Sequence, residues 1–123
     1  MVGASLAAAL ANSTLKIAII DKNAIVTADK EIVDLDGRKI ALSYGSYKIL
    51  QKFQLWPYLD NCATQIQQVH VSKQGHFGAT RISSSDIDTE TLGYVVTLSE
   101  LNQGIQKFLA KHDNIKFYCP AML

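Results

Sequence analysis

The sequence predicts an α/β fold in which a helix packs closely on a short parallel sheet. Residues 2–12 have the composition of such a helix, because glycine and alanine add little bulk while Leu6 and Leu10 share one face. Residues 15–21, LKIAIID, are a short apolar run of the kind that parallel sheets bury, and an acid ends the run. Residues 115–119 predict another short strand, which Pro120 ends. A helix followed by a strand is half of a βαβ unit, which places the chain in the α/β class.

Composition limits the chain to one globular domain and disfavours nucleic acid as a partner. With 123 residues the chain is long enough to bury one core, and 48% hydrophobic against 19% charged residues is typical of a folded protein. The formal net charge is +1, and Arg38 and Arg81 are the only arginines, so an extended phosphate-binding surface is not expected. We therefore expect no binding to nucleic acid.

The sequence indicates neither a membrane span nor a secretory signal. Its longest apolar run, residues 6–11, is far shorter than the roughly 20 residues that cross a bilayer, and no basic segment precedes it. Cys62 and Cys119 lie far apart, without the spacing of a metal site or a redox pair. We therefore expect reduced thiols and a cytoplasmic protein.

The first half of the chain continues with a predicted loop and a predicted helix. Residues 23–37 have no sustained period and end in Asp-Gly, which is typical of an exposed loop. Either Ser43 or Ser46 caps a helix that runs to Gln54, where a Trp-Pro pair follows and ends it. The apolar residues that recur at helical spacing in this helix are Tyr47, Leu50 and Phe53.

Two polar-apolar alternating segments predict a β-hairpin. They are residues 64–72 and 77–84, which flank a Lys-Gln-Gly-His turn, and Val69 and Val71 alternate with polar neighbours. We expect one face of this hairpin to be wet. Residues 83–90 are polar and acidic and predict a loop.

The last part of the chain predicts a strand, a capped helix and the strand already named. Residues 93–96 lead into Thr97-Leu98-Ser99-Glu100, a capping box in which Thr97 and Glu100 each bond an otherwise unpaired backbone amide. The helix that follows has a buried stripe of apolar residues at helical spacing. They are Leu101, Ile105, Phe108 and Leu109.

Gly3 and Asp21 have the spacing of two residues in a dinucleotide-binding motif. In such folds the last glycine of G-x-G-x-x-G lets the first helix pack closely, and an acid about 20 residues on binds the ribose. Asp21 follows Gly3 by 18 positions, since 21 − 3 = 18. One glycine is not a complete motif, so an ordinary close-packed helix is the alternative interpretation.

Several longer segments carry a resemblance to a known family. They are MVGASLAAALA, LKIAIIDKN, DGRKIALSYGSYKILQKFQLWPYL, CATQIQQVHVSKQGHFGATRI and LGYVV. In this order and spacing they resemble the ubiquinone-biosynthesis branch of the FAD-dependent aromatic hydroxylases. The resemblance implies a flavoprotein monooxygenase that uses FAD, NAD(P)H and O2 to hydroxylate a prenylated phenol. It also implies association with a ubiquinone-biosynthesis complex or with the periphery of the inner membrane.

The resemblance assigns five residues to cofactor binding. Gly3 and Ser5 would lie at the pyrophosphate end of the first helix, and Asp21 would accept hydrogen bonds from the adenosine ribose. Arg38 matches the family arginine that approaches the flavin side, where a guanidinium fork suits phosphate or carbonyl oxygens. Gln103 lies where relatives place a polar residue that contacts FAD. The alternatives are an exposed loop arginine at position 38 and an ordinary exposed helical glutamine at position 103.

No residue is assigned to catalysis or to a metal. His76 would border the substrate cavity, because relatives place this hairpin in their substrate domain, but shaping the turn is the alternative role. The chemistry of such enzymes belongs mainly to the cofactor. His70 and His112 have no ligand partners at useful spacing, which disfavours a metal site.

The chain departs from the family by what it lacks. The family's first strand and first two glycines do not precede Gly3, and two later flavin motifs do not follow. We therefore expect residues 1–123 to form a single truncated, Rossmann-like FAD-binding domain without its first strand, with residues 64–96 as an inserted β segment of the substrate-domain type. Strands 15–21 and 115–119 should then pair in parallel, connected by the capped helix.

Two functional interpretations follow from the truncation. The chain is either a fragment of the hydroxylase or a non-catalytic α/β remnant that acts as an interaction module without a cofactor. An open edge of strand 15–21 would leave backbone groups unpaired and would favour self-association. We expect the isolated chain to bind FAD weakly or not at all, because the glycine turn that supplies pyrophosphate-binding amides is missing.

Overall fold

A computed structural model describes residues 2–22, 37–72, 74–75 and 78–122, and shows the mixed α/β class that the sequence predicts. Most of the predicted loop 23–37, together with His76, lies outside these residues. The described elements in chain order are α1 (Val2–Leu10), β1 (Ile17–Ile20), β2 (Lys39–Ser43), α2 (Tyr44–Lys52), the 3-10 helix η1 (Trp56–Tyr58), β3 (Thr64–Ile66), β4 (Gln68–Ser72), β5 (Ala79–Ser83), the 3-10 helix η2 (Ser84–Ile87), β6 (Gly93–Thr97), α3 (Leu98–Leu109) and β7 (Ile115–Tyr118).

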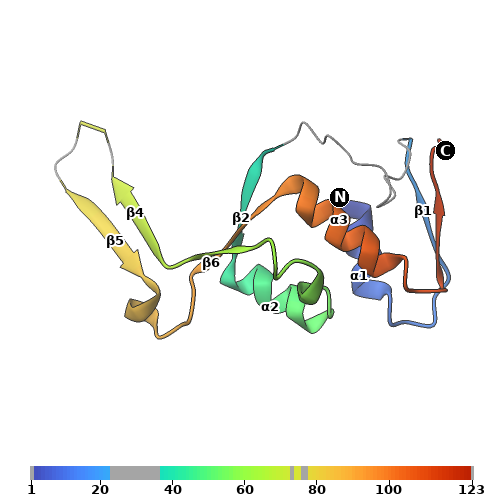
Figure 1. Cartoon of the computed structure of the whole chain (residues 1–123), viewed down its shortest axis with the longest axis horizontal. Coiled ribbons are helices and arrows are strands. Elements are labelled where there is room, and N and C mark those ends of the chain that lie inside the picture. The colour runs from blue at the N-terminus through green and yellow to red at the C-terminus, as the bar shows by residue number, and fades with distance from the viewer. Residues whose placement is uncertain (1, 23–36, 73, 76–77, 123) are drawn as a thin grey trace.

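Strands β1 and β7 pair in parallel, as predicted. Ile17 lies opposite Ile115 and Ile20 lies opposite Tyr118. Figure 1 shows α1 and α3 on the same side of this pair, and Ile17 and Ile19 are half-buried beneath the helices while Ala18 and Ile20 are exposed. The register thus places alternate residues of β1 on a covered face and an open face.

A second sheet forms around β6, with β2 and β3 as its antiparallel neighbours among the described residues. The sequence did not predict β2, and it joined β3 to β4. The strand predicted over residues 64–72 is therefore wrong in extent, because the chain turns at Gln67. The Gln67 carbonyl accepts a hydrogen bond from the Ser84 amide at 3.0 Å, and its side-chain oxygen accepts one from Ser84 Oγ at 2.9 Å.

The β4–β5 hairpin forms as predicted, with Val69 opposite Ile82. It extends away from the rest of the molecule (Figure 1). Every residue of β4 is exposed, including Val69 and Val71. Both faces of this strand are therefore open to solvent in the described structure, where the sequence predicted one. After the hairpin, the loop predicted over residues 83–90 is partly wrong, since η2 forms there with a capping box between Ser83 and Asp86.

Helix α2 settles which serine is the cap. Ser43 is the N-cap, and its Oγ accepts a hydrogen bond from the Ser46 amide at 3.2 Å. The helix ends at Lys52, two residues before the predicted end, and Gln54 adopts a left-handed conformation with φ of 60°. This conformation turns the chain so that Leu55 and Trp56 enter the core.

The core lies where α3 meets α1, η1 and β6. All four residues of the predicted α3 stripe are buried, as are Ala7, Ala8 and Ala11 of the α1 region. Leu6 remains exposed, so the packing of α1 rests on its alanines. These small side chains let α1 approach α3 closely.

The two cysteines are free thiols in the structure. Cys62 is half-buried, and its Sγ donates to the Leu59 carbonyl at 3.0 Å. Burial, and next the negative charge of Glu100, raise the pKa of the Cys62 thiol. The neutral thiol form therefore persists further into the alkaline range than for an exposed cysteine.

Candidate functional site

The end of β1 and the start of α1 lie at the same end of the molecule. In Figure 1, α1 runs opposite to β1, so its first turn lies toward the end where β1 leads into Asp21. The Asp21 amide donates to the Tyr118 carbonyl at 3.3 Å, and the Asp21 carbonyl accepts from the Ala121 amide at 2.8 Å. These bonds fix the main chain of Asp21 beside β7, and the residue is exposed.

The first turn of α1 is open. Gly3 and Ser5 are exposed, and a Cβ placed on Gly3 would meet no atom within 4 Å among its surroundings. The close packing expected for Gly3 is therefore not seen here, while α1 is tightly packed further along, at Ala7 and Ala8. The first turn also carries no acidic residue. The start of a helix carries the positive end of the helix dipole, which suits an anion.

Arg38 is positioned next to the start of α3. Its carbonyl accepts a hydrogen bond from the Leu98 amide at 2.9 Å, which extends the β2–β6 ladder to the first residue of the helix. Gln103 lies further along α3 and is exposed. The first turn of α1, with Gly3 and Ser5, and the Asp21 end of β1 thus lie toward the same end of the β1–β7 pair. Arg38 adjoins the start of α3, the helix that carries Gln103.

The N-terminus of α3 already has its own acid. Glu100 Oε2 accepts from the Thr97 amide at 3.0 Å and from Thr97 Oγ1 at 2.6 Å, and Thr97 Oγ1 accepts from the Glu100 amide at 3.2 Å. The predicted capping box is thereby confirmed. A carboxylate at this end opposes the approach of another anion. Of the two core helices, α1 is therefore the one whose start suits a phosphate.

Asn114 holds the link between α1 and β1 in place, a role that was not predicted from the sequence. Its Nδ2 lies within hydrogen-bond distance of the carbonyls of Ala11, Ser13 and Leu15, at 3.1, 3.2 and 3.0 Å. One carboxamide thus fastens the whole link between α1 and β1 to the start of β7. The Asp-Asn pair at 113–114 was the available signal, since both residues favour turns and bond nearby backbone.

A cluster of aromatic rings fixes α2 against β6. Tyr47 contacts Trp56 and Tyr94, with ring centroids 4.6 and 4.8 Å apart, and Trp56 contacts Tyr94 at 4.5 Å. Burial and the neighbouring Tyr94 raise the pKa of Tyr47. Trp56 Nε1 donates to Asp60 Oδ1 at 3.1 Å, so its polar atom has a partner. The contacts among these rings are packing contacts of the kind that aromatic side chains make in a core, and we assign them no role in a binding site.

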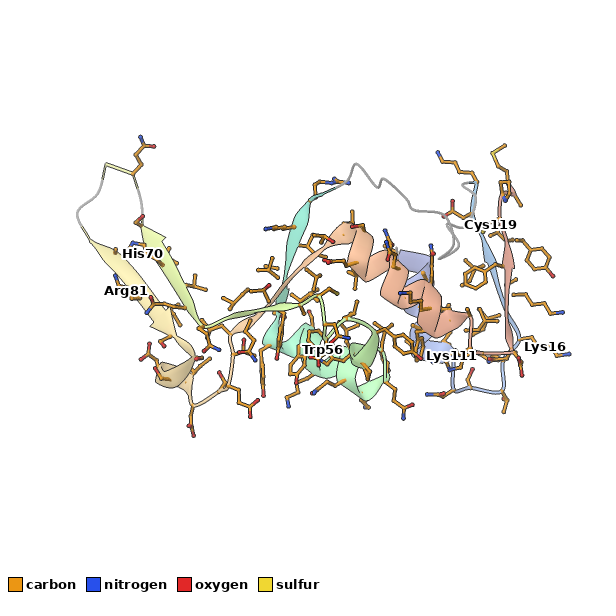
Figure 2. The ribbon with its side chains drawn as sticks, in the orientation of Figure 1. Lys16, Trp56, His70, Arg81, Lys111 and Cys119 are labelled. Carbon is orange, nitrogen blue, oxygen red and sulfur yellow. The ribbon has the colours of Figure 1, made fainter. Side chains whose placement is uncertain are left out.

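Among the described residues, the histidines and cysteines form no metal-binding group. Figure 2 shows His70 and Arg81 on the hairpin, well away from Trp56 and Cys119. Within the described ranges, no group of three or more His, Cys, Asp or Glu residues is arranged to hold a metal ion. No helix in the described part of the chain is both long and apolar enough to span a bilayer.

Comparison with known proteins gives a weak similarity to a longer protein. No family model matches the chain. The chain is 27% identical over all of its 123 residues to the uncharacterized protein slr1300 of Synechocystis sp.. It spans only 28% of the length of that protein. The similarity therefore concerns a small part of a longer polypeptide.

Proposed function

We propose that this chain is the cofactor-binding part of an FAD-dependent aromatic-ring monooxygenase that hydroxylates a prenylated phenol in ubiquinone biosynthesis. The observation that carries the proposal is the position of Asp21, which follows β1 at the end where the first turn of α1 lies. An acid after the second strand of a parallel sheet and an open helix start beside it are the parts of a Rossmann-like nucleotide site. The parallel β1–β7 pair supports the same fold.

The exposed, acid-free start of α1 supports FAD as the cofactor. Gly3 and Ser5 would face the pyrophosphate. The first turn of α1 has no acidic residue that would repel a phosphate, and the space beside Gly3 is open. Asp21 would accept hydrogen bonds from the ribose, and Arg38 and Gln103 would lie on the flavin side. FAD, reduced by NAD(P)H, supplies the oxygen chemistry when bound. The chain's own part would be to bind and orient FAD. The expected role of His76 beside the substrate concerns a residue outside the described ranges.

The complete activity belongs to a longer polypeptide in this proposal. The relative is several times longer than the chain, which spans 28% of it. The remaining part would complete the cofactor site and bind the prenylated phenol. A cytoplasmic location at the periphery of the inner membrane, within a ubiquinone-biosynthesis complex, is part of the same proposal.

One observation favours a non-catalytic interaction module instead. Within the described structure, β1 is paired only to β7, and the apolar side chains of Val2 and Leu6 in α1 and Ile20 in β1 are exposed. Such a surface suits a protein partner. Tight stoichiometric binding of FAD by the isolated chain, with NAD(P)H-dependent reduction of the flavin, would exclude this module.

The experiment is a fluorescence titration with FAD of two proteins. One is the isolated chain, for which we expect weak or no binding; the other is a chimera in which the chain replaces the matched segment of the Synechocystis protein, for which we expect binding. In the chimera, Asp21→Asn should weaken binding by about tenfold or more, the effect of losing a hydrogen bond to a charged group. Asp113→Asn is the matched control, an exposed acid that precedes β7. A chimera without FAD affinity would contradict the proposal.

A further inference from the structure

The link between α1 and β1 is held to β7 by hydrogen bonds from one side chain. Residues 12–16 of this link are all exposed, so burial of apolar surface does not fix their position. The Asn114 side-chain nitrogen lies within hydrogen-bond distance of three main-chain carbonyl oxygens, those of residues 11, 13 and 15. A carboxamide nitrogen carries two hydrogens, so one N–H is shared between two of these carbonyls.

Helix α1 itself presents only small side chains to the core. Its buried residues are Ala7 and Ala8, and Ala11 directly after the helix is buried as well, whereas Leu6 is exposed. Methyl groups bury little apolar area and interdigitate less than large side chains do. Packing alone therefore determines the position of α1 along its own axis only weakly, and the bonds from Asn114 supply a fixed point at its end.

Asn114 lies far from the nucleotide site proposed above. It immediately precedes β7, at the end of the β1–β7 pair where both parallel strands begin. Asp21 follows β1 at the other end of the pair. Figure 2 shows Lys16, which precedes β1, and Cys119, which follows β7, at these two opposite ends. A nucleotide beside the first turn of α1 would thus depend on Asn114 only through the helix.

We propose that Asn114 is a positioning residue for this site. By fixing the end of α1 at the start of β1, it sets where Gly3 and Ser5 lie relative to Asp21. The inference rests on the proposed function, because it concerns the same FAD site. A short helix transmits a shift of its last turn to its first turn, and binding groups have to be held within about 0.5 Å of the productive geometry.

Asn114→Asp is the sharpest variant, because the two side chains have nearly the same shape and differ in the donor. At neutral pH the carboxylate donates no hydrogen bond and faces carbonyl oxygens that carry partial negative charge. The main-chain carbonyl of Asn114, which accepts from the Ile17 amide at 2.8 Å, is unchanged. The variant therefore removes the hold on the link and keeps the register of β1 on β7.

The first readout is hydrogen exchange of the isolated chain. In Asn114→Asp we expect the α1 amides to exchange roughly five- to hundredfold faster, because two donated bonds are lost, while the β2–β6 ladder keeps its protection. The carbonyl oxygens oppose ionisation and raise the pKa of the introduced carboxyl, so the loss is present above that pKa. Protection of α1 should recover in part below about pH 5, where a protonated carboxyl donates one hydrogen bond.

The second readout is the FAD affinity of the chimera with the Synechocystis protein, measured by fluorescence. Asn114→Asp should weaken binding by about three- to tenfold, the effect of misaligned hydrogen bonds to the ligand. Thr91→Val is the matched control. It removes a buried hydroxyl that donates to the Gly93 carbonyl at 2.6 Å, before β6, and should destabilise the protein without changing the FAD affinity.

Unchanged protection of α1 in Asn114→Asp would overturn the inference. So would an Asn114→Asp chimera that binds FAD as tightly as its parent, or a Thr91→Val chimera that loses affinity to the same extent, since general destabilisation would then explain both. A parent chimera without FAD affinity would contradict the proposed function instead. The protection of α1 would still decide whether Asn114 positions the helix.

Discussion

Gly104 occupies a place in α3 where a side chain would collide with the core. A Cβ at this position would lie 2.5 Å from Leu59 Cδ2 and 3.2 Å from the Tyr58 carbonyl oxygen. Leu59 is completely buried. Glycine inside a helix costs about 1 kcal/mol relative to alanine, so its presence here has to be offset by packing. The segment after η1 can approach α3 this closely only because position 104 has no side chain.

We predict that Gly104→Ala destabilises the protein despite its better helix propensity. Overpacking of a core costs about 1–3 kcal/mol against a gain in propensity of about 1 kcal/mol, so we expect a net loss of up to about 2 kcal/mol. Urea unfolding measures the change in free energy. Gly45→Ala in α2 is the control, since the nearest atom to its Cβ is Ser43 Oγ at 3.8 Å. Equal stability of the two variants would contradict the account.

The residues that could be predicted from the sequence are those that interact with residues a few positions away. The Thr97–Glu100 box and the acid that ends β1 are recognisable within a few positions of sequence. Asn114 acts on the Leu15 carbonyl, 99 positions away, and Gly104 acts on Leu59 in a distant turn. The partners of Asn114 and Gly104 come close to them only in the folded chain, so no local sequence pattern predicts these contacts.

Among the elements, α3 shows how a local signal and packing agree. Its capping box stops the backbone of β6 at Thr97, and the helix that begins there buries the predicted stripe against α1 and η1. By contrast, β2 is only five residues long, and its alternation of half-buried Ile40 and Leu42 with exposed neighbours becomes clear only in its pairing with β6. The break between β3 and β4 likewise depends on the contact of Gln67 with Ser84. Elements formed by distant pairing escape periodicity arguments.

We predict that Thr97→Ala destabilises α3 and with it the core. The substitution removes the oxygen that accepts from the Glu100 amide at 3.2 Å, and the loss of an N-cap side chain costs about 0.5–2 kcal/mol. Thermal and urea unfolding give the value. Thr97→Ser keeps the hydroxyl and should stay within about 0.5 kcal/mol of the wild type. A serine variant as unstable as the alanine variant would show that the methyl group, not the cap, matters.

The whole molecule divides into a packed body and an exposed arm. The buried hydrophobic residues come from α1 and Ala11 after it, α3, β6, β7 and the segment around η1, whereas β4 contributes none. A hairpin of two strands is marginally stable by itself in water and depends on packing for protection. The packed body is therefore stabilised by much more buried apolar surface than the β4–β5 arm.

We predict that the backbone amides of the β4–β5 arm exchange with deuterium far faster than those of the β2–β6 ladder. Both are antiparallel pairs of five residues a side, so they are matched in hydrogen bonding and differ in burial. Local opening of the arm exposes little new apolar surface and costs little, while opening of β6 disrupts Tyr94 and Val96 in the core. Hydrogen exchange followed by NMR or mass spectrometry measures the contrast. Equal protection of the two ladders would mean that the arm is covered in solution, since its own contacts cannot supply that stability.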